Sequence, residues 1–83
     1  MECLLYSSSG CHLCEDAVEV LRCVRQTLPT LSWREVEIAD DADLMERYGI
    51  RIPVLALAHV ASELGWPFGP QDVYDFINTH TNT

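Results

Sequence analysis

Two cysteines separated by two residues, Cys11 and Cys14, are the side chains best suited to chemistry in this sequence. They stand where a short apolar run ends in serines and a glycine and a segment with helical periodicity begins. At a strand-to-helix turn this spacing places both sulfurs near the helix start, where unpaired backbone N–H groups and the helix dipole favour a thiolate. The pattern therefore predicts a redox-active dithiol. Half of a zinc site, or two inert cysteines, are the alternatives.

The two cysteines are expected to have different roles. Cys11 should lie at the exposed turn and act as the nucleophile, whereas Cys14, one helical turn on, should be the covered resolving thiol. Cys11 would attack a substrate disulfide, and Cys14 would then release the substrate by attacking Cys11. If Cys14 has no chemistry, an external thiol must do this instead. His12 is predicted to help hold the charge of the nucleophile when protonated, with a solvated turn residue as the alternative.

Length and composition bear on the number of domains and on the cellular compartment in which the protein is found. The 83 residues are expected to form a single domain, 1–83, with a small core. The first residues are acidic where a secretory segment would be basic, and no apolar run is long enough to span a bilayer. We therefore expect a cytoplasmic protein. Thiols stay mostly reduced in that compartment, which favours a transient catalytic disulfide over a structural one.

The charge is strongly acidic, because thirteen Asp and Glu residues outnumber five arginines and the formal net charge is −8. This balance argues against nucleic acid and anionic membrane surfaces, and it favours a protein partner with a basic face. The alternative is that the charge serves solubility alone. We expect a monomer. We also expect no bound metal, because the spacing of His59 and His80 does not encode a zinc site with the cysteines.

Apolar periodicity and turn residues predict the elements that position the dithiol. The predicted order is β-α-β-α-β-β-α, in an α/β fold. Strands are expected over 3–6, 31–38, 53–57 and 62–66, and helices over 13–28, over 40–49 and from 69 onward. Pro53 should begin the third strand because proline cannot donate to a sheet ladder. A hairpin turn around His59 should join the third strand to the fourth.

The same pattern predicts which side chains are buried. The first strand is apolar throughout, as is typical of a strand buried on both faces. Met45 should be buried together with Leu44 and Tyr48 in the second helix. Cys3 and Cys23 are expected to pack in or beside the core, because free cysteine behaves as a small hydrophobe. We assign these two cysteines no chemical role.

Three motifs, in this order, resemble a known family. Cys-His-Leu-Cys at 11–14, Tyr-Gly-x-x-x-Pro-Val-Leu at 48–55 and Glu-Leu-x-Trp-Pro-Phe at 63–68 are similar to segments of short bacterial glutaredoxin-like proteins of the thioredoxin-fold superfamily. The resemblance spans nearly the whole chain. It implies a thioredoxin/glutaredoxin-like fold with a four-stranded mixed sheet and helices on both faces. It also implies a cis peptide bond before Pro53 and thiol-disulfide chemistry at Cys11.

The residues around Pro53 bear on the substrate. Arg51-Ile52-Pro53 stands in the slot where glutaredoxins usually carry Thr-Val-Pro, and the residues at 65–69 replace their pair of glycines. The resemblance leaves Arg51 and the backbone of Ile52 as glutathione contacts. Trp66 and Phe68 are expected to pack, and the alternative is that these aromatic rings line a substrate groove beside the Pro53 loop. Glutathione remains open as a thiol co-substrate, and no cofactor is expected.

The predicted function is a thiol-disulfide oxidoreductase that reduces protein disulfides or mixed disulfides through the Cys11 and Cys14 dithiol. The alternative is a non-enzymatic binding module that presents the face from Cys11 to Pro53 to a protein partner. The two hypotheses differ in whether the pair of thiols is oxidised and reduced reversibly.

Overall fold

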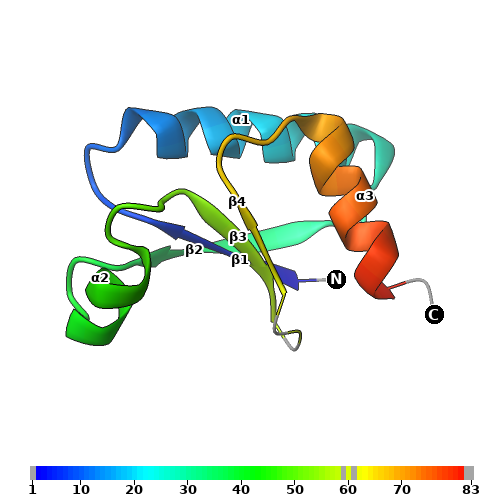
Figure 1. Cartoon of the computed structure of the whole chain (residues 1–83). Helices are drawn as coiled ribbons and strands as arrows, with labels where there is room; N and C mark the ends of the chain where they lie inside the picture. Colours follow the sequence, from blue (N-terminus) through cyan, green and yellow to red (C-terminus); the bar gives the residue numbers. More distant parts are fainter. Residues whose placement is uncertain (1, 59, 61, 82–83) are drawn as a thin grey trace.

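The computed structural model describes residues 2–58, 60 and 62–81, and the centre of the predicted turn at His59 lies outside them. Seven elements follow one another in the predicted order (Figure 1). They are β1 (Glu2–Ser7), α1 (His12–Thr27), β2 (Ser32–Glu37), α2 (Ala42–Tyr48), β3 (Val54–Leu57), β4 (Glu63–Gly65) and α3 (Pro70–Thr81). Within the described residues, none of the helices is both long and apolar enough to cross a membrane.

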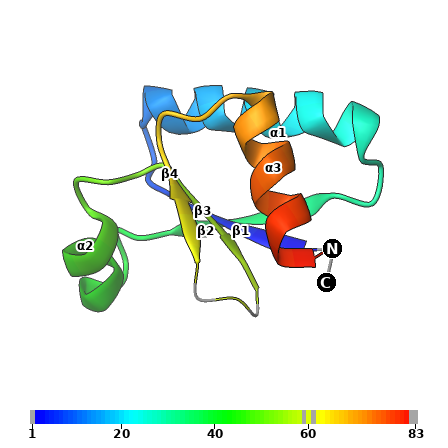
Figure 2. The same cartoon turned by 45° about the vertical axis from the view of Figure 1, so that its right-hand side comes forward.

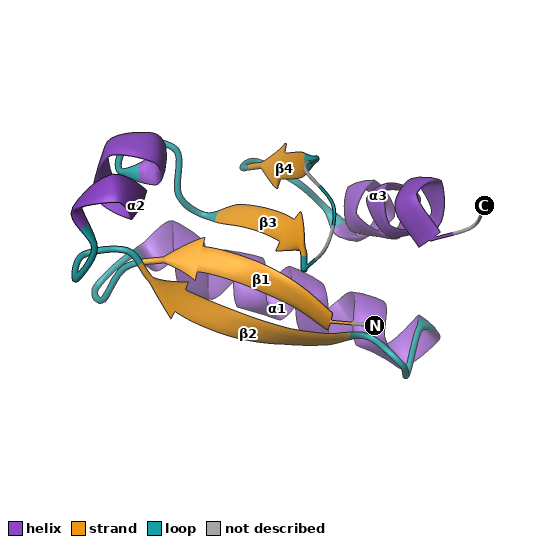
Figure 3. Ribbon diagram, turned by 90° about the horizontal axis from the view of Figure 1, so that it is seen from below, coloured by secondary structure: helices purple, strands orange, loops and turns teal. Residues whose placement is uncertain are grey.

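The four strands form one mixed sheet in the order β2-β1-β3-β4 (Figure 3). β1 is parallel to β2 and antiparallel to β3, and β3 is antiparallel to β4. β3 begins directly after Pro53, as the missing N–H of proline predicts. α1 and α3 lie on one side of the sheet and α2 on the other, near the ends of β1 and β2 (Figures 1 and 2). The predicted thioredoxin-like arrangement is confirmed.

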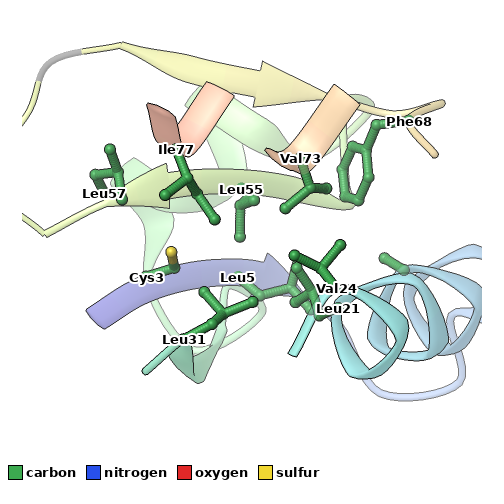
Figure 4. Close-up of a cluster of buried hydrophobic side chains, with 11 residues drawn as sticks. Cys3, Leu5, Leu21, Val24, Leu31, Leu55, Leu57, Phe68, Val73 and Ile77 are labelled. Atoms are coloured by element: carbon green, nitrogen blue, oxygen red, sulfur yellow. The ribbon is translucent and has the colours of Figure 1, made fainter. Parts of the chain in front are cut away.

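The main core lies between the sheet and the helices α1 and α3 (Figure 4). Successive side chains of a strand alternate between its two faces, so the odd-numbered residues of β1 and β3 point toward these helices. The helical periodicity predicted for α1 and α3 matches the sides they bury. The buried members of this core are Cys3, Leu5, Ala17, Leu21, Val24, Leu31, Leu55, Leu57, Phe68, Val73 and Ile77.

A smaller core lies on the opposite face, next to α2. Its members are Ile38, Tyr48 and Val54, with Tyr6, Leu44 and Ile52 packed around them. The rings of Tyr6 and Tyr48 stack with their centroids 4.3 Å apart. The prediction that Met45 is buried is wrong, because its side chain is 45% exposed. α2 has seven residues, and its buried side is narrow: Tyr48 is buried and Leu44 is half-buried.

β1 is less uniformly buried than its apolar sequence predicts. Cys3 and Leu5 are buried, but Leu4 and Tyr6 on the other face are half-buried. α2 covers one end of that face and leaves the rest without a helix (Figure 3). The expectation that β1 is buried on both faces is therefore correct for the face toward α1 and α3, but the opposite face is only half-buried.

Candidate active site

Three connections meet at the edge of the sheet where β1 ends. Tyr6 of β1 pairs with Val54 of β3, so Pro53 lies beside Ser7 at the end of β1. On the other side, the N–H of Trp66 donates a hydrogen bond of 3.2 Å to the carbonyl oxygen of Pro53. The turn before α1, the loop before β3 and the residues after β4 thus gather at one end of the sheet (Figure 2). The three sequence motifs are brought together there.

Cys11 occupies the N-cap position of α1, with an extended backbone (φ −84°, ψ 109°). Its Sγ accepts a hydrogen bond of 3.1 Å from the N–H of Cys14. The two sulfurs lie at disulfide-bonding distance, and the two Cα atoms are 5.2 Å apart. Cys11 is half-buried, whereas Cys14 is only 4% exposed. This geometry provides an accessible sulfur that a backbone donor and the helix dipole can stabilise as a thiolate, and a covered sulfur beside it.

A carboxylate from the neighbouring strand holds the turn before Cys11. Glu37, at the end of β2, accepts hydrogen bonds from the N–H and the hydroxyl of Ser9 at 2.9 and 3.0 Å. It also accepts a bond of 3.3 Å from the N–H of Ala39. These bonds, that of the Ser9 N–H foremost, hold the pKa of Glu37 below its usual range. Gly10 completes the turn with φ +78°, a conformation that glycine adopts at little cost.

An open groove of about 570 Å³ adjoins the two cysteines. It is bounded by the end of β1, one side of α1 and the edge strand β2. Its charged lining residues are Glu15, Asp16, Glu19, Arg22 and Glu35. Arg22 pairs with Glu19 at 2.7 Å, so the groove keeps an excess of negative charge. The sequence predicted that Glu15 and Asp16 lie near Cys11 as opposing anions, but it did not predict that Glu19 and Glu35 line the same groove.

The loop before Pro53 is tied to β4 through its arginine. The Ile52–Pro53 peptide bond is cis, as the resemblance implied. The Arg51 guanidinium lies 3.3 Å from the Glu63 carboxylate and 5.5 Å from the ring centre of Tyr48. The Tyr48 hydroxyl donates to the other oxygen of Glu63. Burial, and next this hydrogen bond, raise the pKa of Tyr48 to about 12. The sequence indicated Arg51 as a substrate contact but did not predict its pairing with Glu63.

The remaining predicted site residues have other surroundings. The side chain of His12 is 95% exposed, and its Nδ1 lies 3.7 Å from the carboxylate of Glu15. Trp66 is half-buried, packs against the main core and meets the ring of Phe68 edge-on at 5.0 Å. A second cis bond, which the sequence did not predict, joins Trp66 to Pro67. His12 is therefore a largely solvated residue, and Trp66 contributes to packing at the edge of the site.

The two other cysteines are free thiols. Cys3 is fully buried, and its burial raises the pKa of the thiol to about 11. The prediction that Cys23 packs is wrong, because Cys23 is exposed on α1 beside the buried Val24. Cys23 lines a shallow groove of about 260 Å³ whose other side includes Pro70 and Tyr74 of α3. In the part of the chain that the structure describes, no three His, Cys, Asp or Glu side chains are grouped to hold a metal ion.

The sheet order, the helices on both faces and the Cys-x-x-Cys at the start of the first helix define a protein of the thioredoxin-like fold. The family model of the glutaredoxin-like domain (DUF836) matches residues 2–78. This chain therefore belongs to the glutaredoxin-like family.

Solved structures agree with this assignment. The X-ray structure of the structural genomics target protein XcR50 from X. campestris is 36% identical, with a TM-score of 0.82 over 93% of this chain and 96% of that chain. The solution structure of the same target is 37% identical, with a TM-score of 0.80 over 95% of each chain. Thioredoxin 1 from Thermosipho africanus TCF52B is 8% identical, with a TM-score of 0.68 over 99% of this chain and 96% of that chain, and shows the fold alone. No curated protein matches the sequence.

Proposed function

We propose that this protein is a thiol-disulfide oxidoreductase that reduces protein disulfides or mixed disulfides through Cys11 and Cys14. One observation carries the proposal: the Cys14 N–H points at the Cys11 Sγ, 3.1 Å away, at the start of a helix. A donor at this position stabilises a thiolate on Cys11 and leaves its sulfur free to attack. The second sulfur, at bonding distance, is ready to complete the exchange.

The reaction is two successive thiol-disulfide exchanges. The Cys11 thiolate attacks one substrate sulfur, a Cys11–S bond forms, the substrate disulfide breaks, and the departing thiolate takes up a proton. Cys14 then loses its proton and attacks the Cys11 Sγ. The Cys11–Cys14 disulfide forms, and the second substrate thiol leaves. Two electrons have passed from the dithiol to the substrate. An external thiol or a reductase must then reduce the protein again, and glutathione is a candidate for that thiol.

The acidic groove supports a protein substrate with a basic face. It opens beside Cys11 and is lined by four carboxylates and one arginine, which is already paired. A disulfide flanked by Lys or Arg would gain from this field, whereas an acidic one would be repelled. Leu13 and Ile50, 48% and 101% exposed, add apolar contacts near the cysteines and the Pro53 loop. The same charge disfavours nucleic acid and anionic membranes.

We further propose that the protein acts as a monomer in the cytoplasm. Cys3 and Cys23 are free thiols, and this state is typical of a reducing compartment. The molecule measures 33 × 24 × 18 Å, and α1, which Cys11 caps, begins at one end of it (Figure 1), so a monomer can bring Cys11 to a disulfide on a larger partner.

Thiol titration before and after mild oxidation tests the proposed function. The reduced chain carries four cysteines, and oxidation should remove two thiols that dithiothreitol restores. Cys14→Ser should lose this reversible pair, and Cys23→Ser should retain it. A wild-type protein that keeps all its thiols would contradict the oxidoreductase proposal and would favour a binding module that uses the same face.

A further inference from the structure

The loop before Pro53 carries a cation that the fold neutralises. Arg51 lies two residues before Pro53, whose peptide bond to Ile52 is cis, and its guanidinium pairs with Glu63 at 3.3 Å. We propose that Glu63 is a specificity-determining residue that, by pairing with Arg51, turns the site away from anionic small disulfides such as glutathione disulfide. This inference rests on the proposed function and specifies its substrate class.

Glu63 occupies the place that a carboxylate of a ligand would take. The Arg51 side chain is 51% exposed, so a ligand beside the Pro53 loop can reach it from solvent. The side chain of Glu63 is 23% exposed and already accepts a hydrogen bond from one nitrogen of the guanidinium. An incoming carboxylate must therefore displace Glu63 or share Arg51 with another anion. Both carry an electrostatic cost.

Tyr48 makes Glu63 difficult to displace. Its hydroxyl donates to Glu63, and its pKa of about 12 keeps that hydroxyl protonated throughout the physiological range. Tyr48 is itself 2% exposed and stacks on Tyr6, so the hydroxyl has a fixed position. Glu63 is thus held by a rigid donor on one oxygen and by Arg51 on the other. A flexible surface carboxylate would give way more readily.

The acidic groove acts in the same direction. Its arginine, Arg22, is also paired with a carboxylate, Glu19. Arg22 in the groove and Arg51 in the Pro53 loop are each paired with a carboxylate, whereas Arg47 of α2 lies over the Tyr48 ring. An anionic disulfide therefore meets no uncompensated positive charge at either position. A neutral or cationic disulfide is not penalised.

The test measures how fast Cys11 is modified by three small disulfides of different charge. Each variant is made in a Cys14→Ser background, so that the reaction stops at the Cys11 mixed disulfide, which is quantified by mass on the Cys11 peptide. The probes are glutathione disulfide, neutral hydroxyethyl disulfide and cationic cystamine. The variants are Glu63→Gln, Arg51→Gln and the double variant. Glu46→Gln, which removes an exposed carboxylate from α2, is the charge-matched control. Circular dichroism checks the fold.

Glu63→Gln should raise the rate with glutathione disulfide, relative to hydroxyethyl disulfide, by about 2- to 5-fold, the size expected for one partly exposed charge pair. Adding Arg51→Gln should cancel this gain, and Glu46→Gln should not produce it. An unchanged ratio in Glu63→Gln, or a gain that survives the loss of Arg51, would overturn the inference. Failure of Cys11 to react with any of the three probes would instead overturn the proposed function.

Discussion

Glu37 accepts hydrogen bonds from both the N–H and the hydroxyl of Ser9, at 2.9 and 3.0 Å, although 28 residues separate them in the chain. The contact joins the end of β2 to the turn that presents Cys11. Because α1 begins at the next residue, this carboxylate helps to fix where the helix starts. The position of Cys11 therefore depends on a strand that carries no cysteine.

This contact predicts a dependence of stability on pH. The folded pKa of Glu37 is lower than its unfolded value of about 4.3, so its contribution is present above that value and is lost as pH falls through the folded pKa. Glu37→Gln should lower the free energy of unfolding at neutral pH and flatten its decline between about pH 5 and pH 3. Urea unfolding at several pH values measures this. Glu35→Gln on the same strand is the control, and equal acid profiles for wild type and Glu37→Gln would contradict the account.

The four thiols should react in a definite order. In the reduced protein, Cys11 should be alkylated first, because a backbone donor favours its thiolate. Cys23 should follow because it is exposed, and Cys14 and Cys3 should react slowly because they are buried. Oxidation should leave Cys23 as the readily labelled residue. Peptide mapping after brief iodoacetamide treatment gives the order. Labelling of Cys3 at a rate similar to Cys11 would contradict the burial that raises its pKa to about 11.

Two leucines on α1 offer a matched test of the core. Leu21 is fully buried, whereas Leu13 is 48% exposed. Leu21→Ala should reduce the free energy of unfolding by about 2–5 kcal/mol, since it removes buried methyl groups and leaves a cavity. Leu13→Ala should change it by no more than about 0.5 kcal/mol. Both substitutions place alanine in the same helix, so helix propensity does not distinguish them. Chemical denaturation measures the difference, and equal losses would refute the assigned core.

The reduction potential should lie closer to about −270 mV than to about −120 mV. The helix dipole and the Cys14 N–H stabilise the reduced form through the Cys11 thiolate, but Glu15, Asp16 and the acidic groove oppose this. Glu15→Gln combined with Asp16→Asn should raise the potential by about 10 to 20 mV. Equilibration with a glutathione redox buffer measures it, and Asp43→Asn with Glu46→Gln on α2 is the control. A strongly oxidising wild type, or no change in the double variant, would contradict this electrostatic argument.

The sequence predicted most of the fold because the necessary signals are local. Apolar periodicity, together with Pro29, Gly49 and Pro53, indicates where the elements begin and end, and the spacing of Cys11 and Cys14 predicts that their sulfurs lie close together. The β-α-β order then requires a crossover between β1 and β2, which the structure shows as a parallel pair.

The parts that the sequence did not reveal depend on long-range contacts. Glu63 is twelve residues from Arg51, and no local pattern indicates that β4 brings the two together. The same holds for Glu37 and Ser9, which meet because β2 and β1 are neighbours in the sheet. The prediction that Cys23 packs failed for another reason. A small apolar residue at the edge of the buried side of a helix can face either way, and tertiary packing decides.

The most direct test of the central claim is a single turnover with a peptide disulfide flanked by lysines. The reduced wild type should release both substrate thiols and finish with a Cys11–Cys14 disulfide. Cys14→Ser should stop at a stable mixed disulfide on Cys11, and Cys11→Ser should release no thiol. Intact-mass analysis and thiol release, followed together, distinguish the three results. If Cys11→Ser reduces the peptide as well as the wild type does, or if the wild type releases no thiol, the proposed dithiol mechanism is wrong.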